Sequence, residues 1–445
     1  MKKVLIISYY WPPAGGIAVQ RITKFCKYLG DFQWEPIVLT VKHGNYESTD
    51  HSLVGDVKHL KHIYRTASIE PHMLYNKIGS FLRTNKNPPR QISGETKLKR
   101  SRFAIFAEYV RLNLFIPDAR IGWLHNAKQC GIQIINKHKP DLIFSTAPPY
   151  TPHLIAMSLH NYSGIPWVAD FRDPWVENTL YNTVKRLRVV KNINRYLERK
   201  VITRANALTF TGPKLRDHYI ESTGIDFTHK ATVITNGYDP DDIPNTTSEN
   251  INKFYVTYFG SLYFQRFQAD LFETLAKLIH SRQELQDNLC VRFIGKVDGE
   301  LKQHLSTIIP ARNIEFSDYI PYKEAIKLLH HPQLLLLTID NVPNNNNITL
   351  GKVFDYLPTG NPILGVGPSD GDTAEILLRT KTGKVFEYDD KQSIASYILE
   401  KYAAWEEGKL KQTELDLNKF HRKTLTKQLS MVFDDLVKKS ETNLE

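Results

Sequence analysis

The chain has 445 residues, of which 41% are hydrophobic and 24% are charged. This is an ordinary composition for a folded protein, and the length suits two domains better than one core. A net charge of +11 favours polyanionic partners such as an anionic membrane or a phosphorylated substrate. No apolar run approaches the roughly 20 residues that span a bilayer. The three widely spaced cysteines argue against a disulfide framework and favour a reducing cytoplasm.

The first forty residues predict the opening of a parallel sheet. A buried strand over residues 3–8 is followed by a loop with Gly15 and Gly16, a helix over 17–29 and a strand over 35–40. This order is a βαβ arrangement. Paired glycines let the backbone approach a ligand at the start of a helix. A simple tight turn explains the glycine pair equally well.

Residues 45–103 carry few regular signals, so we predict a long irregular insertion, which is usually functional or mobile. Basic residues gather at 97–102, beside an apolar and aromatic helix predicted over 103–114. A second basic stretch, residues 185–204, has apolar residues at helical spacing and predicts an amphipathic helix. Its basic face suits either solvent or an anionic membrane surface. Nucleic acid is disfavoured, because no recognition module accompanies the charge.

Charged residues follow the strand predicted over 165–170, in the sequence Asp170-Phe-Arg-Asp173. Open α/β sheets bind ligands at the carboxyl ends of their strands, so this cluster suggests a site. A loop whose charges pair with one another is the alternative. His153, at the start of an earlier predicted helix, is more simply explained as a capping or packing residue.

The second half of the chain restarts the alternation, with strands predicted at 254–259, 291–295, 314–317 and 334–339. Arg266 stands just before a helix, where its planar donor fork suits a diphosphate. Further on, a polar loop leads into a short helix that carries Lys352 and Asp355 on one face. The free N–H groups at a helix start and these two side chains suit a phosphate and a ribose. An ordinary surface ion pair is the alternative.

Two stretches resemble those of a known family. The sequence GKVFDYLPTGNPIL at 351–364 is similar to the C-terminal signature of the family 4 (group 1) glycosyltransferases, and YYWPPAGGIA at 9–18 resembles their N-terminal loop. That family has the GT-B fold, so the resemblance implies an α/β protein with two Rossmann-like domains facing each other across a cleft. We expect an acceptor domain over residues 1–240, including the insertion, and a nucleotide-sugar domain over 241–412. A helix within 413–445 is expected to cross back to the first domain.

The resemblance implies a retaining transfer of a hexose from a nucleotide diphosphate sugar to a saccharide or lipid-linked acceptor, in cell-surface polysaccharide synthesis. The enzyme would be cytoplasmic and peripheral on the inner face of the membrane. Arg266 and Lys352 would stabilise the departing diphosphate, and either Asp170 or Asp173 would orient or deprotonate the acceptor hydroxyl. No metal or other cofactor is expected, since the sequence has no His/Cys cluster or paired-Asp motif. The residues expected to contact the donor are Gly15, Gly16, Gly260, Tyr319, Asn347, Thr349 and Asp355.

Three positions depart from the family pattern. Asn347 stands where the family usually has an acidic residue facing the donor sugar, and Asp355 is Asp instead of Glu. Ser261 stands where Arg commonly follows the glycine. These departures keep two alternatives open: a nucleotide-sugar epimerase on the same fold, and a non-catalytic basic binding protein.

Overall fold

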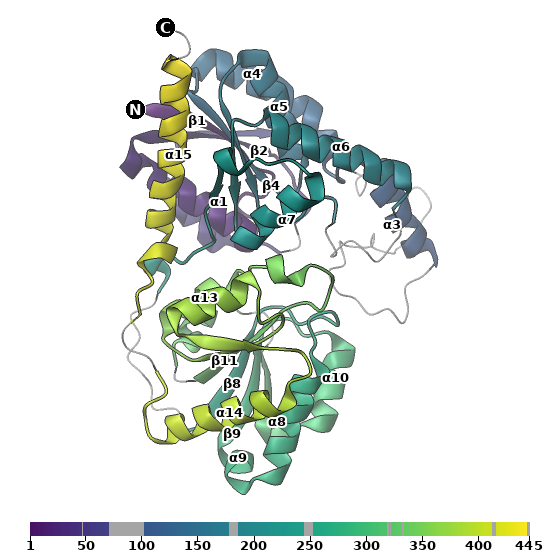
Figure 1. The fold of residues 1–445 in the computed structure, drawn as a ribbon, viewed down its shortest axis with the longest axis vertical. Helices are drawn as coiled ribbons and strands as arrows, with labels where there is room; N and C mark the ends of the chain where they lie inside the picture. Colours follow the sequence, from purple (N-terminus) through teal and green to yellow (C-terminus); the bar gives the residue numbers. More distant parts are fainter. Residues whose placement is uncertain are drawn as a thin grey trace. The chain divides into compact units, whose positions relative to one another are not determined.

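The computed structural model describes residues 1–46, 48–70, 102–177, 186–243, 252–317, 320, 322–331, 333–411 and 415–442. This described chain divides into two compact units, whose elements are labelled in Figure 1. Unit 1 holds the residues up to Thr235 together with the C-terminal segment from Arg422, and unit 2 holds Asn236–His421. The divisions expected from the sequence, 240/241 and 412/413, lie five and nine residues from these points.

Unit 1 is built on a seven-stranded sheet in the order β3-β2-β1-β4-β5-β6-β7, and all neighbouring strands are parallel. The strands are β1 (Lys2–Ile7), β2 (Trp34–Val41), β3 (His62–Thr66), β4 (Leu142–Ala147), β5 (Trp167–Phe171), β6 (Ala207–Phe210) and β7 (Ala231–Val233). The helices are α1 (Ile17–Tyr28), α3 (Arg102–Leu114), α4 (Leu124–His138), α5 (Thr151–Ser163), α6 (Arg188–Arg204), α7 (Pro213–Thr223) and α15 (Arg422–Thr442).

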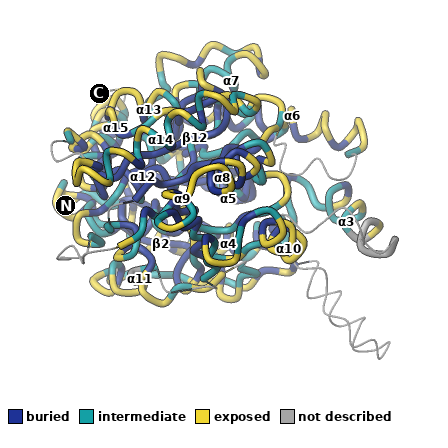
Figure 2. The backbone as a smooth tube through the Cα atoms, turned by 90° about the horizontal axis from the view of Figure 1, so that it is seen from below, coloured by how far each residue is buried: buried dark blue, intermediate teal, exposed yellow. Residues whose placement is uncertain are grey.

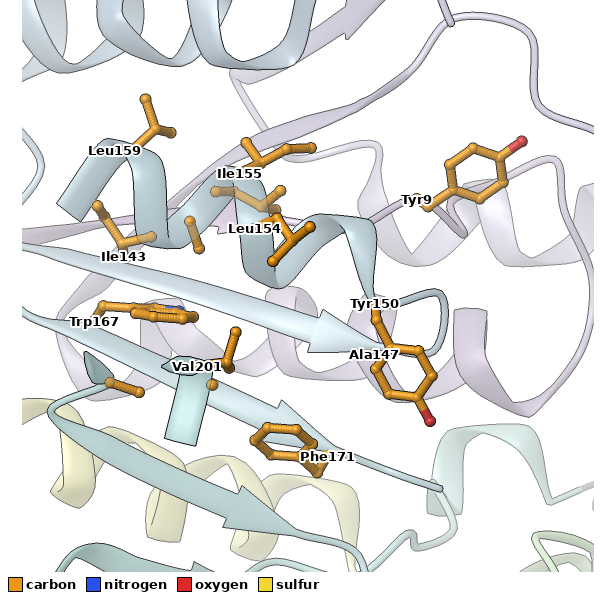
Figure 3. Packing of buried hydrophobic residues seen from close by; sticks show 14 of the residues in the cluster. Tyr9, Ile143, Ala147, Tyr150, Leu154, Ile155, Leu159, Trp167, Phe171 and Val201 are labelled. Carbon is orange, nitrogen blue, oxygen red and sulfur yellow. The ribbon is translucent and has the colours of Figure 1, made fainter. Parts of the chain in front are cut away.

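The central strands of unit 1, β1, β2 and β4 to β6, are buried on both faces, as their nearly continuous apolar sequences predict. Leu5 and Ile7 of β1 belong to the core cluster formed with α4, α5, α6 and α7. Val4 and Ile6 of the same strand belong to a second cluster, formed with α1 and α15. This alternation follows from the two-residue period of a strand. Figure 3 shows part of the first cluster, with the side chains of α5 packed over β4 and Trp167 of β5 nearby.

The C-terminal helix α15 is part of unit 1 and packs against α1. Its Phe433 meets the ring of Trp34 edge-on, at 5.2 Å between centroids, inside the second core cluster. Asp434 on the same helix pairs with Lys2 at 2.5 Å. The helix that the sequence predicted to cross back therefore completes the core of the first unit.

One part of the predicted insertion is regular, so the prediction of an irregular segment from residue 45 onward was wrong there. His51–Val57 form a 3-10 helix, and β3 adds an edge strand beside β2. All five residues of β3 keep some exposure, and three of them are polar or charged, so the strand lacks the apolar run that signals burial. Residues 71–101, the greater part of the expected insertion, lie outside the described residues.

Unit 2 is built on a six-stranded parallel sheet in the order β10-β9-β8-β11-β12-β13. The strands are β8 (Phe254–Phe259), β9 (Leu289–Ile294), β10 (Ile314–Ser317), β11 (Gln333–Thr338), β12 (Ile363–Val366) and β13 (Gly383–Phe386). The helices are α8 (Ala269–Ser281), α9 (Gln283–Asn288), α10 (Gly299–Ile308), α11 (Tyr322–Leu329), α12 (Lys352–Tyr356), α13 (Asp372–Thr380) and α14 (Lys391–Glu406).

Both faces of this second sheet are also covered. Leu334 and Leu336 of β11 join a cluster with α8, α9, α10 and α14, whereas Leu335 and Leu337 join one with α11, α12 and α13. In Figure 2 the buried residues lie toward the inside, and the outer turns of the helices are mostly exposed. Across the described ranges, no helix combines the length and the apolar composition needed to cross a membrane.

Candidate active site

The lysine predicted to bind a diphosphate is buried inside unit 2. Lys352 begins α12, is 8% exposed, and places its Nζ atom 4.0 Å from the centroid of the Tyr258 ring. Within the described part of the chain, this Nζ atom has no hydrogen-bond partner. Burial lowers the pKa of Lys352 and the charge of Arg266 adds to this, whereas Tyr258 and Asp340 offset the lowering only in part. A buried cation without a partner is costly, and such costs are typical of functional sites.

Two buried polar atoms close to Lys352 in the sequence share this property. They are Nδ2 of Asn347, at the end of the 3-10 turn Asn345–Asn347, and Oγ1 of Thr349. Neither has a hydrogen-bond partner among the described residues. Because the large majority of buried polar atoms in proteins are paired, three unpaired atoms within six residues make this segment a candidate binding site.

The loop after β8 brings Gly260 and Arg266 to the same place. Gly260 has φ +98°, and a Cβ atom at this position would lie 3.5 Å from Nζ of Lys352. A side chain here would therefore strain the backbone, and its Cβ atom would be in van der Waals contact with the lysine. Arg266 donates from Nε to Oδ1 of Asp340 at 3.0 Å, which fixes its guanidinium group. The structure thus brings Gly260, Arg266 and Lys352 together, as the prediction of a diphosphate site requires.

Asp355 also lies on α12 but has different neighbours. Its Oδ1 atom accepts a hydrogen bond from the hydroxyl of Tyr322 at 2.6 Å. Since Lys352 points to Tyr258 and has no such partner, the surface Lys–Asp pair that the sequence allowed is not formed. Tyr319, the other residue expected at the nucleotide, lies outside the described residues.

Gly15 and Gly16 occupy the loop between β1 and α1 of unit 1. Gly16 has φ +98° at the position before α1, where no side chain caps the helix. The N–H of Gly15 donates to the carbonyl of Ser48 at 3.0 Å, and the residues next to both form an antiparallel bridge, Ala14 with Thr49. The glycine loop is therefore held in place by the segment that follows β2.

Asp170 is fully buried, and both oxygens of its carboxylate accept hydrogen bonds from neighbouring side chains. It lies in β5, where all five residues are buried, and receives two hydrogen bonds from Arg21, at 2.8 and 3.1 Å. The hydroxyls of Thr146 and Thr209 donate to it at 2.7 Å each. Burial by itself raises the pKa of Asp170, but Arg21 and these hydrogen bonds outweigh burial and hold the pKa below its usual value. The group is a structural carboxylate and has no room for an acceptor.

Asp173 differs in each of these respects. Its side chain is half-buried, and within the described ranges its carboxylate accepts no hydrogen bond. Its backbone carbonyl is held by the hydroxyls of Tyr150 and Tyr219, at 3.1 and 3.0 Å. Burial raises the pKa of Asp173, and the charge of Arg172 offsets this only in part. Of the two candidates for acceptor handling, Asp173 is the one that the geometry leaves accessible.

His153 is a packing residue, as expected. It is fully buried in α5, its Nδ1 atom lies 2.8 Å from Oγ of Ser145, and its ring lies 4.7 Å from that of Phe171. Burial lowers the pKa of His153 to about 3, so the ring stays neutral. It takes no further part in the site.

Tyr258 and Asp340 were missed by the sequence analysis. Tyr258 lies under Lys352, and Asp340 holds Arg266. An aromatic residue in an apolar strand predicts only core packing, so Tyr258 has no distinguishing signal. Asp340 stands just after the strand β11, the same kind of position that drew attention to Asp170, and this signal was sufficient to find it.

Comparisons with known proteins give one family match. Residues 92–242 match the family model described as Glycosyltransferase Family 4. Among curated protein sequences, none matches the chain significantly. Within the described residues, no group of three His, Cys, Asp or Glu side chains is arranged to hold a metal ion.

Several solved structures resemble the whole chain. A glycosyltransferase from Rickettsia africae ESF-5 is 13% identical, with a TM-score of 0.62 over 98% of this chain and 99% of that one. Sucrose-phosphate synthase from Thermosynechococcus elongatus is 11% identical, with a TM-score of 0.60 over 98% and 99%. A UDP-N-acetylglucosamine 2-epimerase is 10% identical, with a TM-score of 0.50 over 96% and 94%.

These likenesses and the two parallel sheets define the class, a protein of two Rossmann-like units with the GT-B fold. Over residues 92–242, the match to the Glycosyltransferase Family 4 model agrees with the resemblance found in the sequence.

Proposed function

We propose that this protein transfers a hexose, with retention at the anomeric carbon, from a nucleotide diphosphate sugar to a saccharide acceptor in cell-surface polysaccharide synthesis. The observation that carries this proposal is the group of buried polar atoms without partners: Nζ of Lys352, Oγ1 of Thr349 and Nδ2 of Asn347. A diphosphate supplies anionic oxygens for the lysine, and sugar hydroxyls supply partners for the threonine and the asparagine.

The chemistry follows from where the charge develops. As the glycosidic bond breaks, negative charge grows on the departing diphosphate, and a fixed cation in a buried site stabilises that charge strongly. Lys352 is such a cation, and Arg266 is held beside it by Asp340. In this proposal Asp355 binds the ribose, and Asp173 orients or deprotonates the acceptor hydroxyl. The proposal assigns no step to a metal ion.

Substitution of Lys352 tests the donor assignment. Lys352→Met removes the cation but keeps a side chain of similar length. We expect the unfolding midpoint of the wild-type protein to rise with at least one member of a panel of nucleotide sugars, and this rise to disappear in the variant. Transfer of sugar from that donor should fall by about 10²-fold or more, the usual cost of losing a preorganised electrostatic contact.

The matched control is Lys277→Met, which removes an exposed lysine on α8 of the same unit. It should change neither the donor-induced shift nor the turnover. If Lys352→Met bound and turned over the donor as the wild type does, the diphosphate assignment would be refuted.

A second candidate activity is epimerisation of a nucleotide sugar, which the structural likeness to the epimerase favours. An epimerase converts the donor without any acceptor. Incubation of the protein with the stabilising nucleotide sugar alone, followed by NMR of the sugar, distinguishes the two activities: a new epimer supports the second candidate, and unchanged donor supports transfer.

We further propose that unit 1 rests on the inner face of an anionic membrane, which holds a lipid-linked acceptor. Large apolar side chains are exposed along α3 and the first half of α6, and Figure 2 shows most of α6 as exposed. Leu114 on α3 is 72% exposed, and Tyr196 on α6 is 60% exposed. On α6, exposed basic residues lie between the exposed apolar ones. Exposed apolar and basic side chains together favour binding to an anionic lipid surface. The exposed apolar residues are Phe106, Tyr109, Leu114, Leu187, Val189, Ile193 and Tyr196, and the basic ones are Arg188, Lys191 and Arg195.

Flotation with vesicles tests this surface. We expect the protein to float with vesicles of phosphatidylcholine and phosphatidylglycerol at low salt, and much less at high salt or without phosphatidylglycerol, because salt screens exposed charges. Val189→Ser with Tyr196→Ser should reduce binding severalfold. The control Leu378→Ser removes a side chain that is 71% exposed in unit 2 and should not. If vesicle binding were unchanged both at high salt and in the α6 variant, the proposal would be contradicted.

A further inference from the structure

Two tyrosine hydroxyls meet at the backbone of the residue assigned to the acceptor. Tyr150 stands just before α5 and Tyr219 lies on α7, and both donate to the carbonyl of Asp173, at 3.1 and 3.0 Å. The Tyr150 hydroxyl also lies 2.7 Å from the next carbonyl, that of Pro174. A carbonyl oxygen has two lone pairs, so the Asp173 carbonyl can accept both bonds. The backbone just after β5 is therefore tied to two other parts of unit 1.

Packing holds both tyrosine rings in place. Tyr219 is 1% exposed, and its ring centroid lies 4.9 Å from that of Phe171. Tyr150 is 4% exposed and is stacked on Trp175, with ring centroids 4.5 Å apart and planes 12° apart. Trp175 is fixed in turn, because its Nε1 atom donates to Oδ1 of Asn194 at 3.0 Å. The two hydroxyls are thus presented to the backbone from rigid surroundings.

The carboxylate of Asp173 depends on this backbone for its position. Across the described ranges, the carboxylate accepts no hydrogen bond of its own. Pro174 follows, and a proline fixes its own φ at about −65° and restricts the backbone of the residue before it. Held by Pro174 on one side and by the tyrosines at its carbonyl, the Cα–Cβ bond of Asp173 has a set direction. Both carboxylate oxygens remain available to an acceptor.

We propose that Tyr150 and Tyr219 are positioning residues for the acceptor reaction: their hydroxyls hold the Asp173 carbonyl, and through it the carboxylate that meets the acceptor hydroxyl. This role is exercised through Asp173 and requires no contact between the tyrosines and the acceptor. A displacement of about 1 Å at a reacting group can cost about 10²-fold in rate. The inference rests on the proposed function, because it takes Asp173 as the residue that orients or deprotonates the acceptor hydroxyl.

The alternative is that these hydrogen bonds serve stability alone. Buried tyrosine hydroxyls usually find a partner, so the same bonds would then be present. The two roles differ in one respect. A positioning residue loses its effect on the rate once the group that it positions is removed, whereas an independent loss of structural integrity adds to any other change.

The experiment measures hydrolysis of a nucleotide sugar, with water as the acceptor. The bond between the anomeric carbon and the diphosphate oxygen breaks, the water oxygen bonds to that carbon, and a proton of the water passes to Asp173. The products are the free sugar and the nucleoside diphosphate. The probes are UDP-glucose, UDP-N-acetylglucosamine, GDP-mannose and ADP-glucose, and the one that the wild type hydrolyses fastest is used for all variants.

The test variant is Tyr150→Phe with Tyr219→Phe, which keeps both rings and removes both hydroxyls. It is made in the wild type and in Asp173→Asn. The control is Tyr64→Phe, which removes a hydroxyl that lies 2.6 Å from Nε2 of His138. This tyrosine belongs to β3, which β2, β1 and β4 separate from β5 in the sheet.

We expect the test variant to lower kcat about tenfold or more, and Asp173→Asn to lower it about 10²-fold, a typical contribution of a general base. In the Asp173→Asn background, removal of the two hydroxyls should lower kcat by less than about twofold further. KM for the nucleotide sugar should be the same in all variants, since Lys352 and its neighbours are unaltered. The control should keep the wild-type kcat.

A fall in kcat of similar size in both backgrounds would overturn the proposal, because the hydroxyls would then act independently of Asp173. A test variant that turns over like the control, while Asp173→Asn is impaired, would also overturn it and would leave the proposed function intact. If Asp173→Asn kept the wild-type kcat, the role of Asp173 and the positioning role would both be refuted, whereas the donor assignment to Lys352 would stand.

Discussion

Both units bury a charged side chain, and the two surroundings are opposite. Asp170 in unit 1 receives four hydrogen bonds, two from Arg21 and one each from Thr146 and Thr209. Lys352 in unit 2 donates none to a described residue, and its Nζ atom lies over the ring of Tyr258. The fold thus supplies a complete set of hydrogen-bond partners for Asp170, whereas no described residue supplies one for Nζ of Lys352.

Buried charges are therefore of two kinds, those with partners and those without, and the sequence alone does not distinguish them. A charge with a complete set of partners contributes to the architecture. Removing it leaves its former partner as an unpaired charge in the low-dielectric interior, which is unfavourable. A charge without partners weakens the architecture, so its presence is better explained by binding. Stability and activity should therefore respond in opposite ways at the two positions.

The largest effect on stability is expected at Asp170. Asp170→Ala leaves the buried guanidinium of Arg21 without its carboxylate, and we expect a loss of about 3–5 kcal/mol in the free energy of unfolding. Urea unfolding followed by circular dichroism measures it. Asp217→Ala, at a half-exposed position of the same unit, should change stability by no more than about 0.5 kcal/mol. Equal losses of unfolding free energy in the two variants would contradict a structural role for Asp170.

A smaller effect, of opposite sign, is expected at Lys352. Lys352→Met exchanges an unpaired buried cation for an apolar side chain, so we expect the ligand-free protein to be as stable as the wild type or more stable by about 1–2 kcal/mol. The same urea experiment without nucleotide measures this. A loss of stability similar to that at Asp170 would show that Lys352 has a structural partner and would weaken the contrast between the two units.

Much of the fold was accessible from the sequence. The strands at 254–259 and 314–317 were predicted with the bounds that the structure has, because apolar runs between polar breakers are distinctive. The edge strand β3 was missed because its residues are half-exposed and mostly polar. Helix α14 was not predicted, although Ile394, Ile398 and Tyr402 bury one face at a spacing of four residues.

The candidate site was predictable only in part. The signature motif and the loop just before it located Asn347, Thr349 and Lys352, which lie within six residues of one another and are therefore visible as a pattern. The sequence did not distinguish the roles of Asp170 and Asp173, because the partner that neutralises Asp170 is Arg21, which lies 149 residues earlier in the chain. Contacts of that kind depend on the order of strands in the sheet, which local patterns do not specify.

The position of α15 has a consequence for how the protein is made. Phe433 and Val437 complete a core cluster whose first members, Val4 and Ile6, lie near the N-terminus. A ribosome must therefore deliver all of unit 2 before unit 1 receives its last helix. The described residues of unit 2 are continuous in the chain and precede α15, so they are all synthesised before unit 1 receives that helix. Loss of α15 would thus damage the core of unit 1 more than that of unit 2.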